Sequence, residues 1–350
     1  MLTKLRLSNY RCYSTLRWDI PAEGAILLGA NAQGKTSLME AICFALTLHS
    51  PRTSRMEKLS RLESARFGIM LETESDTRRL VWAERKLDLR VNGVERKDYA
   101  DFLADSLPVT WLSNNDRELV QGPAEGRRHY LDFLGNQWHP LYRQALQSYR
   151  KALKSRNMLL RHPRRSLAVL RSYAGLLAQH GEIIMQLRVQ LLERLQPHVA
   201  HLHALISGGS EQVQLVYHPS ARQPLGEALE NSLAADEKAG FTTVGPHRDE
   251  VGLLIGGLPA SEYASEGQQR TLAIALQMAQ GSLLQEETGR APILLIDDIF
   301  GELDTERRRA LLRLLPEESQ VFITTTNLDW VGDMALALPV VRVKEATLQA

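Results

Sequence analysis

The sequence predicts an α/β fold whose two halves lie near the ends of the chain and are separated by a mostly helical second domain. Three observations support this prediction. Short apolar runs typical of strands occur toward both ends of the 350-residue chain. A glycine-rich loop stands between one of these runs and a helical segment near the N-terminus. The middle of the chain carries apolar residues at spacings of three and four, the pattern of amphipathic helices.

The first 110 residues are expected to be rich in strands, with one early helix. Residues 2–7 alternate apolar and polar side chains at period two, which is typical of a half-buried strand. Residues 25–28 form a short buried strand, and residues 35–48 form a helix. Further strands of a meander are expected at residues 67–72, 80–84 and 87–91, with Asn92-Gly93 as a hairpin turn.

The pattern becomes helical from residue 138 to about residue 205, where residues 168–177 and 183–195 suit amphipathic helices. Gly208-Gly209 ends this segment. After Gly240 the chain returns to short strands and helices, including the apolar runs 293–296 and 321–324. We therefore expect one domain built from residues 1–110 and 240–350, and a helical arm domain built from residues 111–239.

The composition limits the class of protein. The chain is 44% hydrophobic and 24% charged with a net charge of +1, as in an ordinary globular protein, so any basic surface must come from local segregation of charge. The two cysteines, Cys12 and Cys43, are too few for a disulfide framework or a zinc site, and they favour the reducing cytoplasm. No signal peptide and no run of about 18 apolar residues is found, so no membrane span is expected.

Charge is segregated within the helical arm. Residues 133–181 contain no Asp or Glu, yet they hold nine Lys and Arg residues. Most charge runs are solvated helix faces, but such faces normally mix both signs, and a long run of one sign repels itself without a polyanion. We therefore expect phosphate contacts to nucleic acid from this segment. The DNA-binding candidates are Arg150, Lys151, Lys154, Arg161, Arg164 and Arg165.

Residues 29–36 read Gly-Ala-Asn-Ala-Gln-Gly-Lys-Thr and match the P-loop pattern G-x-x-x-x-G-K-[ST] between a strand and a helix. Backbone N–H groups and the helix N-terminus of such a loop hold phosphate oxygens. Lys35 would reach the β- and γ-phosphates, and the Thr36 hydroxyl would bind Mg²⁺. The expected cofactors are therefore ATP and Mg²⁺, and the expected nucleotide-binding residues are Gly29, Ala30, Asn31, Ala32, Gln33, Gly34, Lys35, Thr36 and Ser37.

The apolar run 293–296 is followed by Asp297 and Asp298. Acids at the carboxyl end of a buried strand are where P-loop ATPases hold Mg²⁺, the Walker B position, and we assign that role to Asp297. Asp298 is placed to orient or deprotonate the attacking water. The candidate catalytic residues are thus Asp298 and Lys35. Two aspartates that merely cap the next segment are the alternative, which the P-loop disfavours.

Residues 265–270, Ser-Glu-Gly-Gln-Gln-Arg, open a helix that runs to residue 279, and Ser265 suits its N-cap. Because the segment precedes the Walker B strand, it is similar to the ABC signature motif. There the serine hydroxyl, the glycine N–H and the helix dipole approach the γ-phosphate of ATP bound to another protomer. This resemblance adds Ser265, Gly267 and Gln268 to the ATP-binding residues. It also makes residues 301–304 the D-loop, and it places residues 324–327 where many relatives carry a γ-phosphate-sensing histidine.

Together these motifs resemble the RecF family of bacterial recombination and replication-repair ATPases, over nearly the whole chain. The resemblance rests on Asn9-Tyr10-Arg11, the P-loop, Gly122-Pro123 with Arg127-Arg128, Gly245-Pro246-His247-Arg248-Asp249, the signature, Asp297-Asp298 and residues 324–327. It implies an ABC-ATPase-type head, related to SMC proteins, that carries a short helical second domain.

The resemblance further implies a cytoplasmic protein with weak, DNA-stimulated ATPase activity that forms an ATP-dependent homodimer on duplex and gapped DNA. The dimer would act as a clamp and, with RecR and RecO, help to load recombinase at gaps. ATP held by one subunit would be capped by the signature of the other. Single residues stay open between phosphate contacts and salt bridges within the fold, namely Arg127, Arg128, His247 and Arg248.

The sequence departs from related patterns at three places. Asp298 stands where transporter ATPases have Glu, and the shorter carboxylate lies farther from the water, so we expect a slow timer; RecF-like proteins share this Asp. Gly301 stands where the family usually has Ser. Residues 114–116 occupy the Q-loop region without a Gln.

Two alternatives remain. The ATPase subunit of a transporter explains the nucleotide motifs but not the acid-free arm or the segment 245–249. A small-molecule P-loop kinase would need an acceptor pocket and no signature. A long coiled-coil SMC or break-repair ATPase is excluded because the arm is too short and lacks the cysteine pair of a zinc hook.

Overall fold

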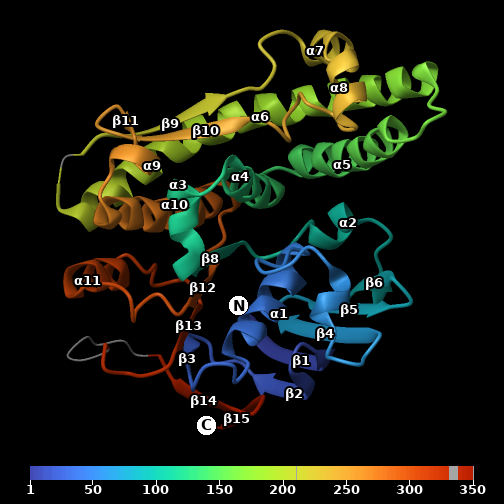
Figure 1. The fold of residues 1–350 in the computed structure, drawn as a ribbon. Coiled ribbons are helices and arrows are strands. Elements are labelled where there is room, and N and C mark those ends of the chain that lie inside the picture. The colour runs from blue at the N-terminus through green and yellow to red at the C-terminus, as the bar shows by residue number, and fades with distance from the viewer. Residues whose placement is uncertain (210, 331–337, 350) are drawn as a thin grey trace. The chain divides into compact units, whose positions relative to one another are not determined.

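The computed structural model describes residues 1–209, 211–330 and 338–349 (Figure 1). The chain divides into two units: unit 1 comprises Met1–Asp116 with Gln280–Ala350, and unit 2 comprises Arg117–Ala279. The first boundary lies near the expected residue 110. The second differs from the expected residue 240, because strand β10 (Glu250–Ile255) pairs with strand β9 (Val213–His218) and keeps the returning chain in unit 2.

Unit 1 contains a six-stranded sheet in the order β15-β14-β3-β13-β12-β8. All neighbouring strands are parallel except the last hairpin, β14 with β15. The central strands are buried along almost their whole length, as the parallel strands of α/β proteins are. The strands span β3 (Gly24–Leu28), β8 (Val109–Ser113), β12 (Ile293–Asp297), β13 (Val321–Thr325), β14 (Val340–Lys344) and β15 (Thr347–Gln349).

The second sheet of unit 1 is antiparallel, in the order β2-β1-β4-β5-β6-β7. Both residues of the predicted hairpin turn have positive φ, 51° at Asn92 and 80° at Gly93, as a type I′ turn requires. The expected meander is confirmed. The strands span β1 (Leu2–Tyr10), β2 (Tyr13–Asp19), β4 (Arg66–Thr73), β5 (Thr77–Ala83), β6 (Lys86–Val91) and β7 (Val94–Glu95).

Helix α1 (Lys35–Thr47) follows the P-loop and is buried on nearly every side. It contacts strands of both sheets, which explains why its sequence is apolar around the whole helix rather than along one stripe. The other short elements of unit 1 are η1 (Met56–Leu59), α2 (Tyr99–Leu103), η2 (Asn114–Asp116) and α11 (Thr305–Arg313).

Unit 2 is mostly helical. The two helices expected at 168–177 and 183–195 form one helix, α6 (Leu167–Ser207), because no residue between them breaks the helical backbone. Helix α6 ends at Gly208, which has φ 66° and caps it, as expected. The other helices are α3 (Arg117–Gln121), α4 (Ala124–Trp138), α5 (Pro140–Leu160), α7 (Leu225–Asn231), α8 (Leu233–Ala239), α9 (Ala260–Tyr263) and α10 (Glu266–Thr288), which continues into unit 1.

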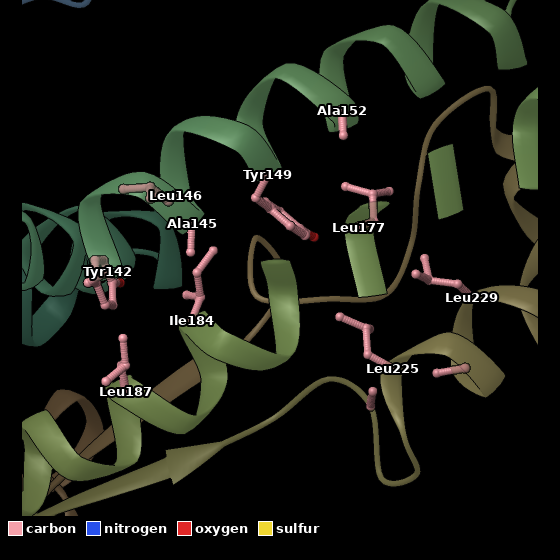
Figure 2. Packing of buried hydrophobic residues seen from close by; sticks show 12 residues of the cluster. Tyr142, Ala145, Leu146, Tyr149, Ala152, Leu177, Ile184, Leu187, Leu225 and Leu229 are labelled. Atoms are coloured by element: carbon pink, nitrogen blue, oxygen red, sulfur yellow. The ribbon is translucent and has the colours of Figure 1, made fainter. Parts of the chain in front are cut away.

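The core of unit 2 joins α5, α6 and α7 (Figure 2). Buried residues of α5 recur at spacings of three and four and face buried residues of α6. At Gly181 the backbone of α6 approaches α7 so closely that a Cβ would lie 2.4 Å from Leu225 Cδ2. The cluster comprises Tyr142, Ala145, Leu146, Tyr149, Ala152, Leu177, Ile184, Leu187, Ala221, Leu225, Ala228 and Leu229.

Two expectations from composition concern cysteines and membrane spans. Cys12 and Cys43 are both free thiols, the first exposed and the second buried. Among the residues that the structure describes, no helix combines the length and the apolar character needed to cross a bilayer.

Candidate functional site

The predicted P-loop connects the carboxyl end of β3 to the first residue of α1. Gly34, the residue before α1, has φ 110°, and a Cβ there would lie 2.8 Å from Tyr13 Oη and 2.9 Å from Cys12 Sγ. Glycine is therefore required at this position both by the backbone conformation and by the close approach of the β2 region. This path leaves the loop amides at the N-terminus of α1, where anions bind.

Lys35 is folded back over the loop. Its Nζ donates to the carbonyls of Gly29 at 2.7 Å and Ala30 at 2.9 Å. Burial lowers the pKa of Lys35, while the carboxylates of Asp298 and Asp297 oppose that shift. The loop thus holds one ammonium group between its own carbonyls and two aspartates, as a phosphate-binding lysine requires.

Asp297, at the carboxyl end of β12, accepts two hydroxyl hydrogen bonds at one oxygen. Thr36 Oγ1 donates to Oδ1 at 2.8 Å and Thr324 Oγ1 donates to the same atom at 2.7 Å. Burial raises the pKa of Asp297, and the hydrogen bonds from Thr324 and Thr36 counter it. The parallel pairing of β12 with β13 places Asp297 opposite Thr324, which explains their proximity.

Thr36 and Asp297 suit a magnesium ion. Mg²⁺ prefers oxygen ligands and is held in nucleotide sites by one or two carboxylates together with phosphate oxygens and water. Thr36 Oγ1 and Asp297 Oδ1, 2.8 Å apart, supply a hydroxyl and a carboxylate at the edge of the P-loop. Within the described ranges no three His, Cys, Asp or Glu residues are grouped so that they could hold a metal ion.

Asp298 has a left-handed backbone, with φ 54°. This conformation costs a non-glycine residue roughly 1–2 kcal/mol. Two contacts hold it: the Asp298 amide donates to Thr324 Oγ1 at 3.0 Å, and Asn114 Nδ2 donates to the Asp298 carbonyl at 2.6 Å. Asn114 belongs to the segment 114–116, which occupies the Q-loop region. Its side chain therefore supports the backbone of Asp298, the candidate catalytic residue.

A pocket of about 320 Å³ opens over the loop, and we call it the P-loop pocket. Of the nine nucleotide-binding residues predicted from the P-loop segment, seven line this pocket; the other two, Gly29 and Ala30, accept hydrogen bonds from Lys35. Its other walls come from Asp298, from Thr324 of the segment 324–327, and from Cys12 and Arg52, which no motif singled out. The full lining is Cys12, Asn31, Ala32, Gln33, Gly34, Lys35, Thr36, Ser37, Arg52, Asp298 and Thr324.

Arg52 is tied to the segment 9–11 through a buried carboxylate. Glu40, on α1, is fully buried and accepts from Arg11 Nε at 2.7 Å and Arg11 Nη2 at 2.6 Å. Arg52 Nη1 lies 3.6 Å from the same carboxylate, and Ser50 Oγ donates to it at 2.5 Å. The first residues of α1 also line the P-loop pocket. The contacts to Glu40 on the same helix therefore hold Arg52 in place beside the loop. The sequence signal that could have predicted this network is Glu40 itself, a single charged residue in an otherwise apolar part of the helix.

The signature residues form the expected helix start. The amide of Gln268 donates to Ser265 Oγ at 3.2 Å, and the amide of Ser265 donates to Gln268 Oε1 at 2.7 Å, a reciprocal capping box at the N-terminus of α10. Ser265 is exposed. Ser265, Gly267 and Gln268 belong to unit 2, and they are not among the residues that line the P-loop pocket within unit 1.

The D-loop segment begins at an open position. A Cβ added at Gly301 would meet no atom within 4 Å, so the serine that the family usually carries would fit there. Asp304, at the end of the segment, caps α11 by accepting from the Arg307 amide at 2.8 Å.

The acid-free segment 133–181 has carboxylate partners from other parts of unit 2. Arg156 is buried and pairs with Asp236 at 2.7 Å. The remaining pairs are Arg150 with Asp132, Arg165 with Glu237 and Arg171 with Glu230. The self-repulsion expected from the sequence is thus partly relieved within the fold. Of the DNA-binding candidates, those that form no ion pair with any described residue are Lys151, Lys154, Arg161 and Arg164.

The four residues left open between phosphate contacts and salt bridges, Arg127, Arg128, His247 and Arg248, divide into two groups. Arg127 makes a bidentate ion pair with Glu250, with Nε–Oε1 2.8 Å and Nη2–Oε2 2.9 Å. His247 contacts Tyr149 Oη at 2.6 Å through Nδ1 and the Thr242 carbonyl at 3.0 Å through Nε2. The polar groups of these two side chains are therefore engaged in contacts within the protein. Arg128 and Arg248 form no such side-chain ion pair among the described residues.

Comparison with known proteins relates the chain to one group. The family model described as RecF/RecN/SMC N terminal domain matches residues 1–349. The DNA replication and repair protein RecF of Synechococcus sp. is 37% identical over 348 residues, covering 93% of this chain and 91% of that protein. The RecF of Acaryochloris marina is 37% identical over 357 residues, covering 93% of both chains.

Solved structures agree with this relationship. A structure of the recombination mediator protein RecF-ATPrS in the RecFOR pathway matches with a TM-score of 0.88 at 27% identity, covering 100% of this chain and 97% of that one. An SmcHead bound to the C-winged helix domain of ScpA matches with a TM-score of 0.55 at 15% identity, covering 99% and 96%. The second likeness concerns the fold alone. The predicted ABC-ATPase-type head with a helical insertion is confirmed.

Proposed function

The chain belongs to the RecF family, and we propose that it is an ATP-dependent, dimerising DNA-binding protein of recombinational repair and replication restart. The observation that carries the proposal is the convergence of Thr36, Thr324 and Lys35 with the two aspartates at one end of the parallel sheet. Family membership also removes the main support for the transporter ATPase alternative.

In this proposal the loop amides and Lys35 bind the phosphates of ATP. Thr36 and Asp297 hold Mg²⁺, which when bound polarises the β- and γ-phosphate oxygens. Asp298 orients the attacking water and accepts its proton. Its position is set by Thr324 and Asn114 through backbone contacts, so the carboxylate has little freedom to compensate for being one methylene shorter than Glu. We therefore propose that ATP hydrolysis is slow and is stimulated by DNA, and that its rate sets the lifetime of the ATP-bound dimer on DNA.

Dimerisation would complete the site. The exposed Ser265 hydroxyl and the first amides of α10, a 23-residue helix, offer hydrogen-bond donors and a positive helix end to the γ-phosphate of ATP held by a second copy. Because this contact exists only in the dimer, ATP stabilises the dimer by its differential affinity for that state.

DNA contact is proposed for the four DNA-binding candidates that form no ion pair with a described residue. Lys151 and Lys154 lie three positions apart on α5, and Arg161, seven positions after Lys154, is the residue that caps the end of this helix. Helical geometry puts residues at such spacings on one side. Exposed ammonium and guanidinium groups bind the phosphate backbone without reading sequence. ATP-driven closure would clamp DNA, hydrolysis would release it, and RecR and RecO are the proposed partners in loading recombinase at gaps.

The test is the mass in solution with and without ATP and Mg²⁺, repeated with duplex DNA and with Asp298→Asn. The expected result is a monomer that becomes a dimer with ATP, and a mutant dimer that persists on DNA. A mass that ATP leaves unchanged while nucleotide still binds would remove the role of Ser265 across subunits, and a single-chain nucleotide-binding protein would become the better description.

A further inference from the structure

Unit 2 contains a second polar pocket, which we call the arginine pocket. It measures about 340 Å³ and is bounded by α4, α5, α6 and residues 246–248. This volume lies within the range of about 300–1,000 Å³ found for small-molecule sites. Its charged lining consists of four arginines and two carboxylates: Arg128, Arg150, Arg188, Arg248, Glu125 and Asp132.

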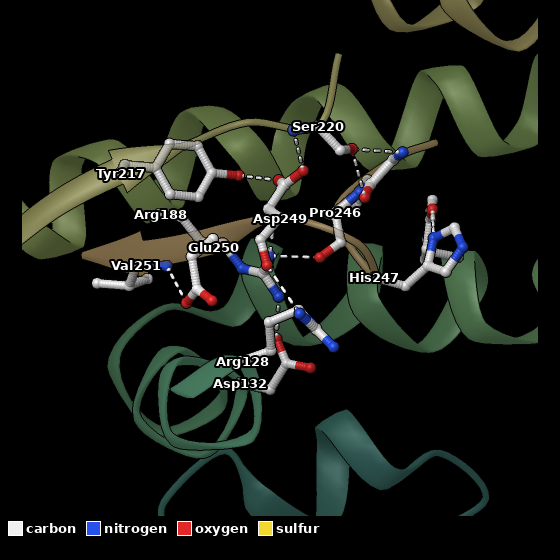
Figure 3. A network of polar contacts seen from close by, with 12 residues as sticks. Arg128, Asp132, Arg188, Tyr217, Ser220, Pro246, His247, Asp249, Glu250 and Val251 are labelled. Carbon is white, nitrogen blue, oxygen red and sulfur yellow. Dashed lines mark hydrogen bonds and ion pairs between the residues drawn. The ribbon is translucent and has the colours of Figure 1, made fainter. Parts of the chain in front are cut away.

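The floor of this pocket is a closed network (Figure 3). Arg188, which is 2% exposed, donates to Asp132 Oδ1 at 2.9 Å and to the Pro246 carbonyl at 2.6 Å. Arg150 donates to the other oxygen of Asp132 at 2.9 Å. Burial alone would raise the pKa of Asp132, but Arg188 and Arg150 outweigh it and hold that pKa below its ordinary value. Asp132 is therefore fully engaged and rigid.

Arg128 and Arg248 are the two arginines of this pocket that form no ion pair with a described residue. Arg128 Nη1 donates to a backbone carbonyl, that of Asp249, at 2.9 Å, because the nearby Glu250 is occupied by Arg127. The guanidinium of Arg248 stacks over the Phe241 ring, 4.8 Å from its centroid. Burial lowers the pKa of Arg128, and Arg188 and Arg248 lower it further against the opposing effects of Glu250 and Glu125. An anion placed between Arg128 and Arg248 would relieve this repulsion.

One part of the pocket is apolar. It comes from Leu146 and Leu153 on α5, Ile184 on α6 and the Pro246 ring. A small inorganic anion makes polar contacts and would leave this apolar surface uncovered. A ligand that is anionic at one end and apolar or aromatic at the other would use both parts.

We propose that the arginine pocket binds one nucleotide residue, with its phosphate between Arg128 and Arg248 and its sugar or base against the apolar wall. Arginine forks bind phosphate oxygens in bidentate geometry, and the stacked Arg248 is already ordered for it. The nucleotide is either free in solution or part of a DNA strand, and the second source rests on the proposed DNA binding. The site is separate from the P-loop pocket, which lies in unit 1.

The experiment uses methyl NMR of the full chain. Ile184 lines the arginine pocket, Ile26 lies on β3 before the P-loop, and Ile206 lies near the end of α6, so their methyl signals report separate places. The probes are deoxyadenosine monophosphate, deoxyadenosine, inorganic phosphate and a short single-stranded oligodeoxynucleotide. We expect the monophosphate to shift Ile184 at concentrations where deoxyadenosine and phosphate leave it unchanged.

The matched variants are Arg248→Ala and Arg128→Gln, with Arg222→Ala as control. Arg222 is an exposed arginine of the same unit that does not line the pocket. Removing one charge-assisted phosphate contact should weaken the Ile184 titration by about tenfold or more. The control should match the wild type. Because Arg248 is exposed, its substitution should leave the fold intact, and an unchanged Ile206 signal checks this.

Each outcome decides the question. A shift with the oligonucleotide but not the monophosphate assigns the pocket to a strand, and a shift with both assigns it to nucleotides from either source. Equal shifts with inorganic phosphate, or no Ile184 shift with any probe, would overturn the proposal. Binding of the oligonucleotide by the wild type that leaves the Ile184 signal unchanged would overturn the pocket while leaving the proposed function standing. If ATP does not drive dimerisation but the Ile184 titration is as expected, the proposed function would be contradicted and the nucleotide site in the pocket would stand.

Discussion

The Thr324 hydroxyl donates a 2.7 Å hydrogen bond to Asp297 Oδ1, the oxygen that also accepts from Thr36. The same hydroxyl oxygen accepts from the Asp298 amide at 3.0 Å. One side chain from β13 therefore orients the proposed magnesium ligand and the proposed catalytic aspartate together. Thr324 thus positions two functional groups without being required to touch the reacting atoms.

Thr324→Val keeps the shape of the side chain but removes both hydrogen bonds. We expect the Mg²⁺ concentration needed for half-maximal ATP hydrolysis to rise and the free energy of unfolding to fall by about 1–3 kcal/mol, because a buried amide and carboxylate lose partners. A Mg²⁺ titration of hydrolysis at saturating ATP measures the first effect. Thr47→Val, which removes a hydroxyl bonded within the end of α1, is the control. Equal Mg²⁺ requirements for all three proteins would contradict the positioning role.

Arg11→Ala leaves the buried Glu40 carboxylate without its bidentate partner. We expect the free energy of unfolding to fall by about 3 kcal/mol, because breaking one side of a buried ion pair strands the other charge. Denaturant unfolding measures this. Arg6→Ala is the matched control, since Arg6 is half-exposed and lies 3.4 Å from Glu72. Its expected loss is within about 0.5 kcal/mol, as for other surface pairs. Similar losses for the two variants would show that Glu40 does not depend on Arg11.

The double variant Lys151→Ala with Lys154→Ala tests the proposed DNA surface. Each lost phosphate contact should lower the slope of log affinity against log salt by about 0.9, so the pair should lower it by roughly two. Binding of duplex DNA measured over a salt series gives the slope. Arg171→Ala is the control, because Arg171 already pairs with Glu230 at 2.6 Å. An unchanged slope in the double variant would move the DNA surface away from α5.

His247 makes stability depend on pH. Its burial, which outweighs the opposing contact with the Thr242 carbonyl, lowers its pKa to about 4. The unfolded chain binds a proton at about pH 6.5, so the contribution is present above that pH and is lost as pH falls toward 4. It amounts to about 3 kcal/mol, as an order of magnitude.

The difference in unfolding free energy between the wild type and His247→Asn, followed from neutral pH down to about pH 4, isolates this contribution from that of the carboxylates. We expect the difference to shrink as the pH falls through this window. His201→Asn, at an exposed position of α6, is the control. A difference that stays constant with pH would mean that His247 is protonated equally in the folded and unfolded chain.

The sequence by itself determined the nucleotide chemistry and most of the elements that carry it. The P-loop, the acids after β12 and the capped start of α10 are each made of neighbouring residues, and their geometry depends on local backbone conformation and hydrogen bonds. The hairpin at Asn92-Gly93 and the end of α6 at Gly208 followed for the same reason. Local patterns are sufficient where the physical cause is local.

The tertiary structure decided which distant groups meet. Thr324 is placed beside Asp297 by the pairing of two parallel strands, and Arg11 reaches Glu40 across 29 positions of the chain. Most counterions of the acid-free segment, such as Asp236 for Arg156 and Glu230 for Arg171, come from helices that follow it by dozens of residues. The boundary of unit 2 is likewise set by strand pairing. No local pattern encodes these contacts, because burial and charge neutralisation depend on which surfaces the folded chain brings together.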